Sequence, residues 1–323
     1  MEGKIGPYFS PNRGVRQGCP LSCLLFDLCM EPLAIRLRNE LSGISLKSPH
    51  HINTENLVTS LMADDITIYF SIEDIPKILK IFREWEKGSG MKLNSHKTHV
   101  LWLGAMRGST KCVGFFKPKS PEETFKLVGI EFDSDGRFTT TQWQGIIAKM
   151  TDRLPIARVL KLSIFGRSGL ANSFALSMLW YLAQCCVPIT QDIINKVYAI
   201  IFYYIWRGKH VGQVQRDFCL NLKSAGGTGV LDIWADIRGF YAQWVRRLFD
   251  PSDRPWKTLF CHFIGEMTWP YNLHLGLFDP AAKNIAVPSS TPQAFKVIVK
   301  AWREIQAIPD RKNLHRDQIA NQI

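Results

Sequence analysis

Two adjacent aspartates, Asp64 and Asp65, interrupt the stretch LMADDITIYF, residues 61–70, which is otherwise apolar or β-prone. Successive residues of a strand point to opposite faces, but at a tight hairpin both side chains can reach the same end of the sheet. Converging carboxylates repel each other, and a divalent cation such as Mg²⁺ removes that penalty because it favours carboxylate and phosphate oxygens. The pattern therefore indicates a metal-binding hairpin. The alternative is a solvated turn whose aspartates bond their own backbone.

Three further stretches stand in a fixed order around this hairpin. RGVRQGCPLS, residues 13–22, leads into a helix-like run, GMKLNSHKT stands at residues 90–98, and KLVGIEF comes later, at residues 126–132. In this order and spacing, the four stretches resemble the reverse transcriptase domain of non-LTR (LINE-type) retrotransposons. The helical runs LSIFGRSGLANSFALSMLWYLAQ and IFYYIWRG are similar to the region after the palm in that family, so the resemblance covers roughly residues 8–250.

The resemblance implies nucleotidyl transfer, in which a primer 3′-hydroxyl attacks the α-phosphate of an incoming deoxynucleoside triphosphate on an RNA template. Two divalent metal ions, Mg²⁺ or Mn²⁺, hold the attacking and leaving oxygens in such a reaction. By resemblance, Asp64 and Asp65 are the metal ligands and belong to the catalytic centre. Lys97 matches a lysine near the nucleotide phosphates, where a cation can stabilise the leaving pyrophosphate or donate a proton. An exposed turn lysine is the alternative for Lys97.

The resemblance also implies a set of side chains that contact the nucleotide or the template. A guanidinium suits phosphate, Gln17 offers both a donor and an acceptor, and Gly18 lets backbone approach a ligand closely. The alternatives are solvated surface for the arginines and a helix entry without a ligand for Gln17 and Gly18. Asn94 is expected to fix the turn before Lys97. The set comprises Arg13, Arg16, Gln17, Gly18 and Asn94.

Leu127, Val128 and Gly129 match the family's hairpin that holds the primer end. The family usually has an aromatic residue where this chain has Leu127, and another where Met62 precedes the aspartates. Both replacements keep apolar volume. They leave the position of each hairpin open, but not its existence.

The chain is basic, with 40 Lys and Arg against 28 Asp and Glu and a net charge of +12. Such a balance indicates a polyanionic partner, either nucleic acid or an anionic membrane surface. Residues 141–254 contain 14 Lys and Arg against 7 Asp and Glu, counted from the sequence. A surface that tracks a nucleic-acid backbone needs such cations for phosphate contact and counterion release. The densest set is Lys149, Arg153, Arg158, Lys161 and Arg167.

Hydrophobic periodicity predicts helices at residues 20–41 and 72–90, a hairpin turn at residues 63–65, a strand–turn–strand at residues 91–104 and another hairpin at residues 125–138. Helix-like runs dominate after residue 141, and their tryptophans are expected to lie in the core. We therefore predict an α+β fold, a partial right-hand polymerase palm with an antiparallel sheet. Its predicted divisions are a palm at 1–140, a thumb-like helical region at 141–250 and a tail with one amphipathic helix at 251–323.

Eight cysteines with no C-x-x-C pair predict reduced thiols in an intracellular protein. The N-terminus has no apolar core typical of a signal peptide, and the longest apolar run, FALSMLWYLAQCCVPI, is shorter than the roughly 20 residues that span a bilayer. No membrane segment is therefore expected. A nuclear location is implied by the family resemblance alone.

The family's first metal-binding aspartate lies upstream of the RQG motif, and residues 1–12 contain no aspartate. We therefore expect an N-terminally truncated element, with Met1 an internal methionine of a longer frame. Such a chain is expected to bind metal poorly and to polymerise slowly or not at all. The alternatives are a catalytically inactive nucleic-acid-binding remnant of a decayed element, and an unrelated basic helical protein with a chance ADD.

Overall fold

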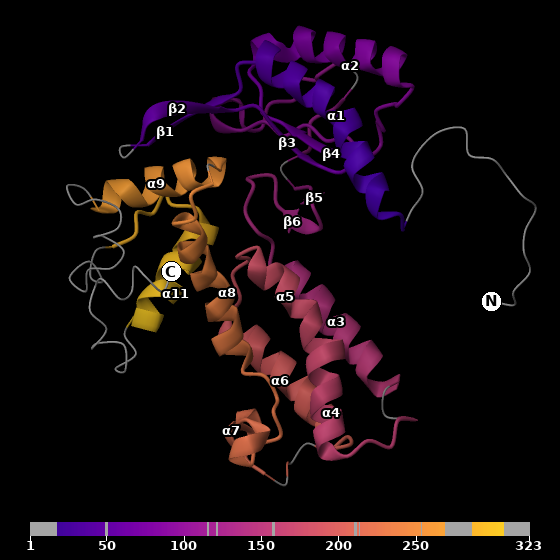
Figure 1. The fold of residues 1–323 in the computed structure, drawn as a ribbon, viewed down its shortest axis with the longest axis vertical. Coiled ribbons are helices and arrows are strands. Elements are labelled where there is room, and N and C mark those ends of the chain that lie inside the picture. The colour runs from indigo at the N-terminus through magenta and orange to yellow at the C-terminus, as the bar shows by residue number, and fades with distance from the viewer. Residues whose placement is uncertain are drawn as a thin grey trace, which may run out of the picture. The chain divides into compact units, whose positions relative to one another are not determined.

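The computed structural model describes residues 18–48, 51–114, 116–120, 122–156, 159–209, 212, 214–252, 254–268 and 286–306. The chain divides into two compact units (Figure 1). Unit 1 comprises Met1–Leu46, Thr54–Trp102 and Ser109–Pro118. Unit 2 comprises Lys47–Asn53, Leu103–Gly108 and Lys119–Ile323.

Two helices form the larger part of unit 1. α1 (Pro20–Glu40) has a proline at its first position, where the fixed φ of proline suits a helix start. α2 (Ile75–Ser89) ends at Gly90, whose φ of 69° is the left-handed conformation common after a helix. The helices pack through a core to which α1 contributes Leu33 and Leu37, and α2 contributes Ile81. Both helices confirm the sequence prediction within two or three residues.

The strands of unit 1 are short. β1 (Ile44–Ser48) pairs with β2 (His51–Leu57), and β3 (Thr59–Met62) pairs antiparallel with β4 (Asp65–Ile68). Among the described residues, each strand pairs only with the strand that is next to it in sequence. The predicted antiparallel sheet therefore exists there as separate two-stranded sheets. Leu61, Ile66 and Ile68 pack against the core of α1 and α2, which fixes the register of the second hairpin.

The strand–turn–strand predicted at residues 91–104 is wrong. The segment contains a turn at residues 95–97 and one isolated bridge, from Val100 to Pro118. The side chain of Asn94 accepts hydrogen bonds from the backbone N–H groups of His96 and Lys97, at 3.1 and 3.2 Å. Such local side-chain bonds offer the backbone an alternative to a ladder, so the apolar residues of this segment lie in irregular structure.

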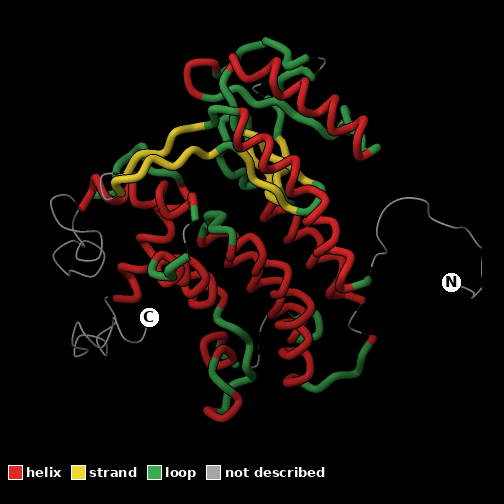
Figure 2. Tube along the Cα trace, turned by 45° about the horizontal axis from the view of Figure 1, so that its top comes forward, coloured by secondary structure: helices red, strands yellow, loops and turns green. Residues whose placement is uncertain are grey.

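The longest segment of unit 2, Lys119–Ile323, contains the hairpin β5 (Phe125–Leu127) and β6 (Ile130–Phe132) and continues in helices (Figure 2). One helical run passes from α4 through a π-helical segment, η4, into α5. The helical elements are α3 (Thr141–Ile156), α4 (Ile164–Leu170), η4 (Ala171–Leu176), α5 (Ser177–Gln184), α6 (Gln191–Ile205), α7 (Arg216–Leu220), η5 (Lys223–Ala225), α8 (Ile233–Leu248), α9 (Pro255–Thr268) and α11 (Gln293–Gln306).

A single hydrophobic core holds unit 2 together. Trp143 of α3 is fully buried, and its indole N–H donates to the Pro188 carbonyl at 2.8 Å. Trp206 is buried as well, and the other tryptophans of α5 and α8 are half-buried against the core, so the prediction that they pack inside is confirmed. The core includes residues of β6, α9 and α11. The predicted domain boundaries at residues 140 and 250 stay predictions. Within the described ranges, none of the helices is both long and apolar enough to cross a membrane.

Candidate functional site

The predicted aspartate hairpin is present in unit 1, between β3 and β4. Met62 and Asp65 face each other as the last strand pair, so Ala63 and Asp64 form the turn. Ala63 has a φ of 53°, and a positive φ at the first turn residue suits the right-handed twist of a hairpin. Both aspartate side chains are exposed. In the part of the chain that the structure describes, neither carboxylate has a hydrogen bond or an ion pair. The alternative from the sequence, a turn whose aspartates bond their own backbone, is therefore not seen in these residues.

The fit of this hairpin to a metal centre is partial. Two exposed carboxylates can supply oxygens to a divalent cation. However, the described residues contain no group of three or more His, Cys, Asp or Glu side chains placed to hold a metal ion. Asp64 and Asp65 by themselves therefore do not make a complete two-metal site. All eight cysteines are free, as the sequence predicted.

Lys97 lies in the turn at residues 95–97 of unit 1, and Asn94 immediately precedes this turn. Besides its side-chain bonds, Asn94 accepts through its carbonyl from the backbone N–H of Thr98 at 2.9 Å and from its hydroxyl at 2.8 Å. Through these hydrogen bonds, Asn94 fixes the turn that follows it. The Lys97 side chain is exposed, and among the described residues no ion pair joins it to Asp64, Asp65 or any other carboxylate.

The turn before α1 carries the next predicted contact. Gly18 is exposed with a φ of 84°, a conformation that favours glycine, and no atom of the described residues lies within 4 Å of the position where a Cβ would stand. Free space beside the backbone is what close approach of a ligand requires. The other predicted contacts of this motif, Arg13, Arg16 and Gln17, lie outside the described residues.

The predicted primer hairpin is in unit 2, between β5 and β6. Val128 and Gly129 form its turn with φ of 50° and 77°, whereas Leu127 is the last residue of β5. A β-branched residue with positive φ is strained, and such strain persists only where surrounding contacts hold it. Here the hydroxyl of Tyr181, on α5, donates a hydrogen bond to the Val128 carbonyl. Sequence reasoning missed Tyr181, because nothing local links residues 53 positions apart.

The predicted basic set divides into exposed and half-buried members. Lys149 and Arg153 are exposed on α3 and Lys161 is exposed before α4, whereas Arg158 lies outside the described residues. Arg153 Nη1 donates to Met178 Sδ at 3.6 Å. Arg167 is half-buried and donates from Nε to the Ile205 carbonyl and from Nη1 to the Leu162 carbonyl, both at 2.6 Å. It therefore caps the end of α6. Burial and the nearby Arg207 lower the pKa of the Arg167 guanidinium.

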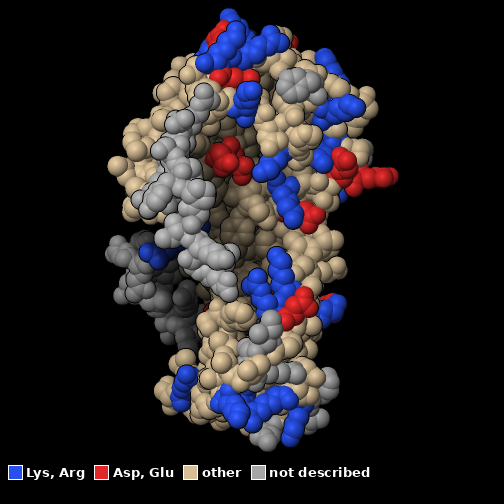
Figure 3. All heavy atoms as spheres, turned by 90° about the vertical axis from the view of Figure 1, so that its right-hand side faces the viewer, with Lys and Arg blue, Asp and Glu red and all other residues tan. Residues whose placement is uncertain are grey.

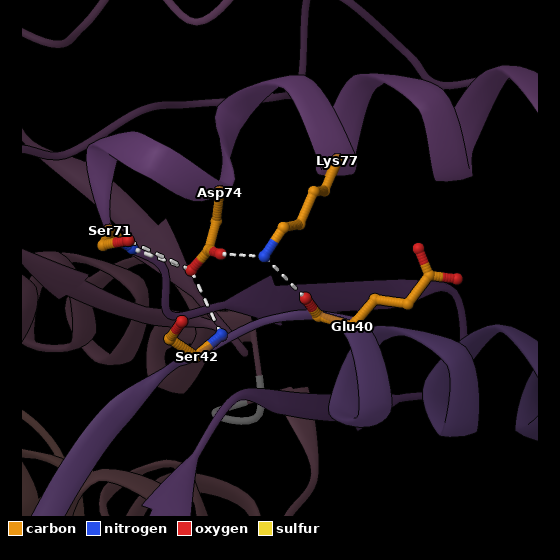
Figure 4. A network of polar contacts seen from close by, with 5 residues as sticks. All are labelled: Glu40, Ser42, Ser71, Asp74 and Lys77. Atoms are coloured by element: carbon orange, nitrogen blue, oxygen red, sulfur yellow. Dashed lines mark hydrogen bonds and ion pairs between the residues drawn. The ribbon is translucent and has the colours of Figure 1, made fainter.

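A buried carboxylate, Asp74, supports the fold of unit 1 (Figure 4). Its Oδ2 accepts from the Ser42 N–H, the Ser71 N–H and the Ser71 hydroxyl at 3.2, 3.3 and 3.2 Å, and its Oδ1 pairs with Lys77 Nζ at 3.3 Å. Lys77 also donates to the Glu40 carbonyl at the end of α1. Burial alone would raise the pKa of the Asp74 carboxyl, but these donors outweigh burial and hold it below its ordinary value.

The comparisons with known proteins agree with this arrangement. Residues 3–132 match the family described as reverse transcriptase (RNA-dependent DNA polymerase), which implies a palm-like fold and the use of divalent metal ions in general. The chain is 28% identical over 307 residues to a Xenopus laevis protein named Transposon TX1 uncharacterized 149 kDa protein, covering 92% of this chain and 22% of that protein. It is 29% identical over 133 residues to the retrovirus-related Pol polyprotein from type-1 retrotransposable element R2 of Popillia japonica, covering 38% of this chain and 21% of that protein.

These matches confirm the predicted resemblance. The family match at residues 3–132 and the two relatives, one named for a transposon and one for a retrotransposable element, are consistent with the reverse transcriptase of a non-LTR retrotransposon. The aligned regions span about a fifth of the length of each of these relatives.

Proposed function

We propose that this chain is a fragment of an RNA-directed DNA polymerase of a non-LTR retrotransposon, which uses two divalent metals for nucleotidyl transfer when complete. The observation that carries the proposal is the exposed, unpaired carboxylate pair of Asp64 and Asp65 at a hairpin tip within the reverse transcriptase match. Its substrates would be an RNA template, a DNA primer and deoxynucleoside triphosphates. It would act inside the cell, in the nucleus.

Each candidate residue has a role that its chemistry supports. Asp64 and Asp65 would offer carboxylate oxygens to Mg²⁺ or Mn²⁺, which supplies Lewis-acid chemistry to phosphoryl transfer when bound. Lys97 would place its positive charge near the phosphates of the nucleotide. Val128 and Gly129 would present backbone to the primer end. Gly18 would let the main chain come close to the template, together with Arg13, Arg16 and Gln17.

A second candidate function is supported by the incomplete ligand set. A chain that retains two carboxylates and a basic surface, without a third ligand among its described residues, is suited to binding nucleic acid without chemistry. The two candidates make different predictions about Asp64. A polymerase needs its carboxylate, whereas a binding remnant does not.

Primer extension by the full chain tests the choice. We expect Mg²⁺- or Mn²⁺-dependent extension of a DNA primer on an RNA template to be slow in the wild type and lost in Asp64→Asn. Asp152→Asn changes an exposed aspartate of α3, serves as the control of equal charge and should extend like the wild type. Mn²⁺ binding measured by electron paramagnetic resonance gives a second readout that needs no turnover. Primer–template binding without extension, unchanged by Asp64→Asn, would establish the binding remnant instead.

A further inference from the structure

One end of unit 2 gathers positive charge. Figure 1 shows that this end carries α7 and the start of α4, and in Figure 3 Lys and Arg side chains gather at the lower end of the face drawn, with no Asp or Glu visible among them. The cations come from the start of α4, the turn after α6, α7 and η5. We name them the end cluster: Lys161, Arg167, Arg207, Lys209, Arg216 and Lys223.

The centre of the end cluster is a pair of arginines that share one acceptor. Arg167 Nη1 and Arg207 Nη2 both donate to the Leu162 carbonyl, at 2.6 and 3.5 Å. The chain turns sharply to achieve this, since Arg207 and Gly208 have φ of 54° and 86°. The turn is closed by the Gly208 N–H, which donates to the Tyr203 carbonyl at 2.8 Å. The backbone thus holds the two guanidiniums close together, although the positive φ of Arg207 is unfavourable for a residue with a side chain.

Few acids accompany the end cluster. Among the described residues, no member forms an ion pair with a carboxylate, and α7 contributes a single acid, Asp217. Burial and the charge of Arg207 together lower the pKa of Arg167, as expected where like charges approach. Protein folds usually relieve such repulsion with an acid. A cluster whose described members have no such ion pair is suited to an anion from outside the chain.

Exposed apolar side chains lie in the segments that carry the end cluster. Phe165 stands in the first turn of α4 and Phe218 in α7, and both rings are about half exposed. Leu222, just before η5, is 72% exposed. Arg216 lies over the ring of Phe202, with 5.5 Å between Cζ and the ring centroid. Cations interleaved with open aromatic rings are the composition of surfaces on which the bases of a single strand stack.

We propose that the end cluster binds single-stranded nucleic acid, with its cations on the phosphates and Phe165 and Phe218 stacked against bases. A duplex hides its base faces, so exposed rings favour an unpaired strand. The inference rests on the proposed function, since it is the reverse transcriptase match that favours nucleic acid over other polyanions. It also differs from the sequence prediction, which placed part of the backbone contact on α3.

The test compares two double variants of the full chain that remove equal charge. Arg207→Gln with Arg216→Gln changes the end cluster, and Arg246→Gln with Lys300→Gln changes exposed cations of α8 and α11 outside the predicted nucleic-acid surface. Arg167 is left intact because its hydrogen bonds hold α4 against α6. Binding of a short fluorescein-labelled RNA strand is measured by anisotropy over a range of salt concentrations, and circular dichroism checks the fold of each variant.

The end-cluster variant should bind about tenfold or more weakly, with a salt slope smaller by about 1.4, because each of the two lost phosphate contacts lowers the slope by about 0.7 on a single strand. The control double variant should change little. Phe218→Leu, which removes the ring and keeps apolar volume, should weaken binding about fivefold or more.

Three outcomes would overturn the inference. Equal weakening by both double variants would mean that net charge alone sets affinity. Loss of binding to phosphatidylserine vesicles, with RNA binding unchanged, would assign the end cluster to an anionic membrane surface. A wild-type chain that binds no nucleic acid at all would contradict the proposed function as well, and this separates the failure of one proposal from the failure of both.

Discussion

The buried Asp74 allows a quantitative test of how unit 1 is held together. Its carboxylate is 1% exposed and joins the end of α1 to the start of α2 through the backbone N–H groups of Ser42 and Ser71, the Ser71 hydroxyl and Lys77. In Asp74→Asn, the amide can present its oxygen to the backbone donors only by turning its NH₂ group toward the Lys77 ammonium. Either orientation leaves a donor facing a donor.

The expected cost can be worked out from these partners. A hydrogen bond to a charged group contributes about 1.5–3 kcal/mol, and a buried donor left without an acceptor costs about 1–3 kcal/mol. The Lys77 side chain is half exposed, so its ion pair adds at most about 1 kcal/mol. We expect Asp74→Asn to destabilise unit 1 by about 2–4 kcal/mol. Lys77→Gln, which removes the exposed partner alone, should cost less than about 1 kcal/mol.

The same carboxylate predicts a pH dependence of definite sign. The pKa of the Asp74 carboxyl is lower in the folded chain than in the unfolded chain, where it is about 3.9. The contribution of Asp74 to folding stability is therefore fully present above that unfolded pKa and is lost as the pH falls through the folded pKa. The difference in stability between wild type and Asp74→Asn should therefore shrink below about pH 4.

Hydrogen exchange of peptides covering residues 72–90, measured from about pH 3 to pH 7 after correction for intrinsic rates, reports on this unit locally. A difference that stays constant across that range, or a variant as protected as the wild type, would refute the reasoning about Asp74.

Two further predictions concern tyrosines of unit 2. Tyr181→Phe should destabilise the β5–β6 turn by about 1 kcal/mol because it removes the donor to the Val128 carbonyl. In that variant, Val128→Gly should restore protection from hydrogen exchange because it relieves the strain of the positive φ. Hydrogen exchange of residues 125–132 measures both effects, and the absence of either would contradict the strain argument. Tyr204→Phe should leave the melting temperature unchanged or raise it, because the buried Tyr204 hydroxyl has no hydrogen-bond partner among the described residues. A fall in melting temperature equivalent to more than about 1 kcal/mol would show that the hydroxyl is bonded in solution.

The parts of the fold that sequence predicted well are those with local causes. Proline at the start of α1, glycine after α2 and alternating apolar residues around Asp64 and Asp65 each act within a few positions, so the helices and the hairpin were placed to within a few residues. The segment at residues 91–104 has the same apolar alternation, but Asn94 redirects its backbone. In this segment a local turn signal competes with the strand pattern, and the turn forms.

The roles that sequence did not predict depend on distant partners. The sequence predicts that Arg167 is a free surface cation, but its side chain donates to the Ile205 carbonyl, 38 positions away. Tyr181 likewise acts on a turn 53 positions away. Charge density along the chain identifies which residues are basic, but tertiary packing decides which of them remain available to a ligand.

The π-helical segment Ala171–Leu176 has a consequence for insertions and deletions. A π turn contains one residue more than an α turn, so η4 is equivalent to an α-helix with a residue inserted. Deleting one residue there would let α4 and α5 join as an ordinary helix and would leave the faces of α5 unchanged, because the wider π turn already absorbs the extra residue. A deletion in the regular part of the run, at Ser177 or Met178, would instead rotate the following residues by about 100° relative to α4. Tyr181 would then leave the Val128 turn, and Leu179 would leave the core. The run thus tolerates the loss of one residue in η4 but not in α5, on whose angular phase the hairpin depends.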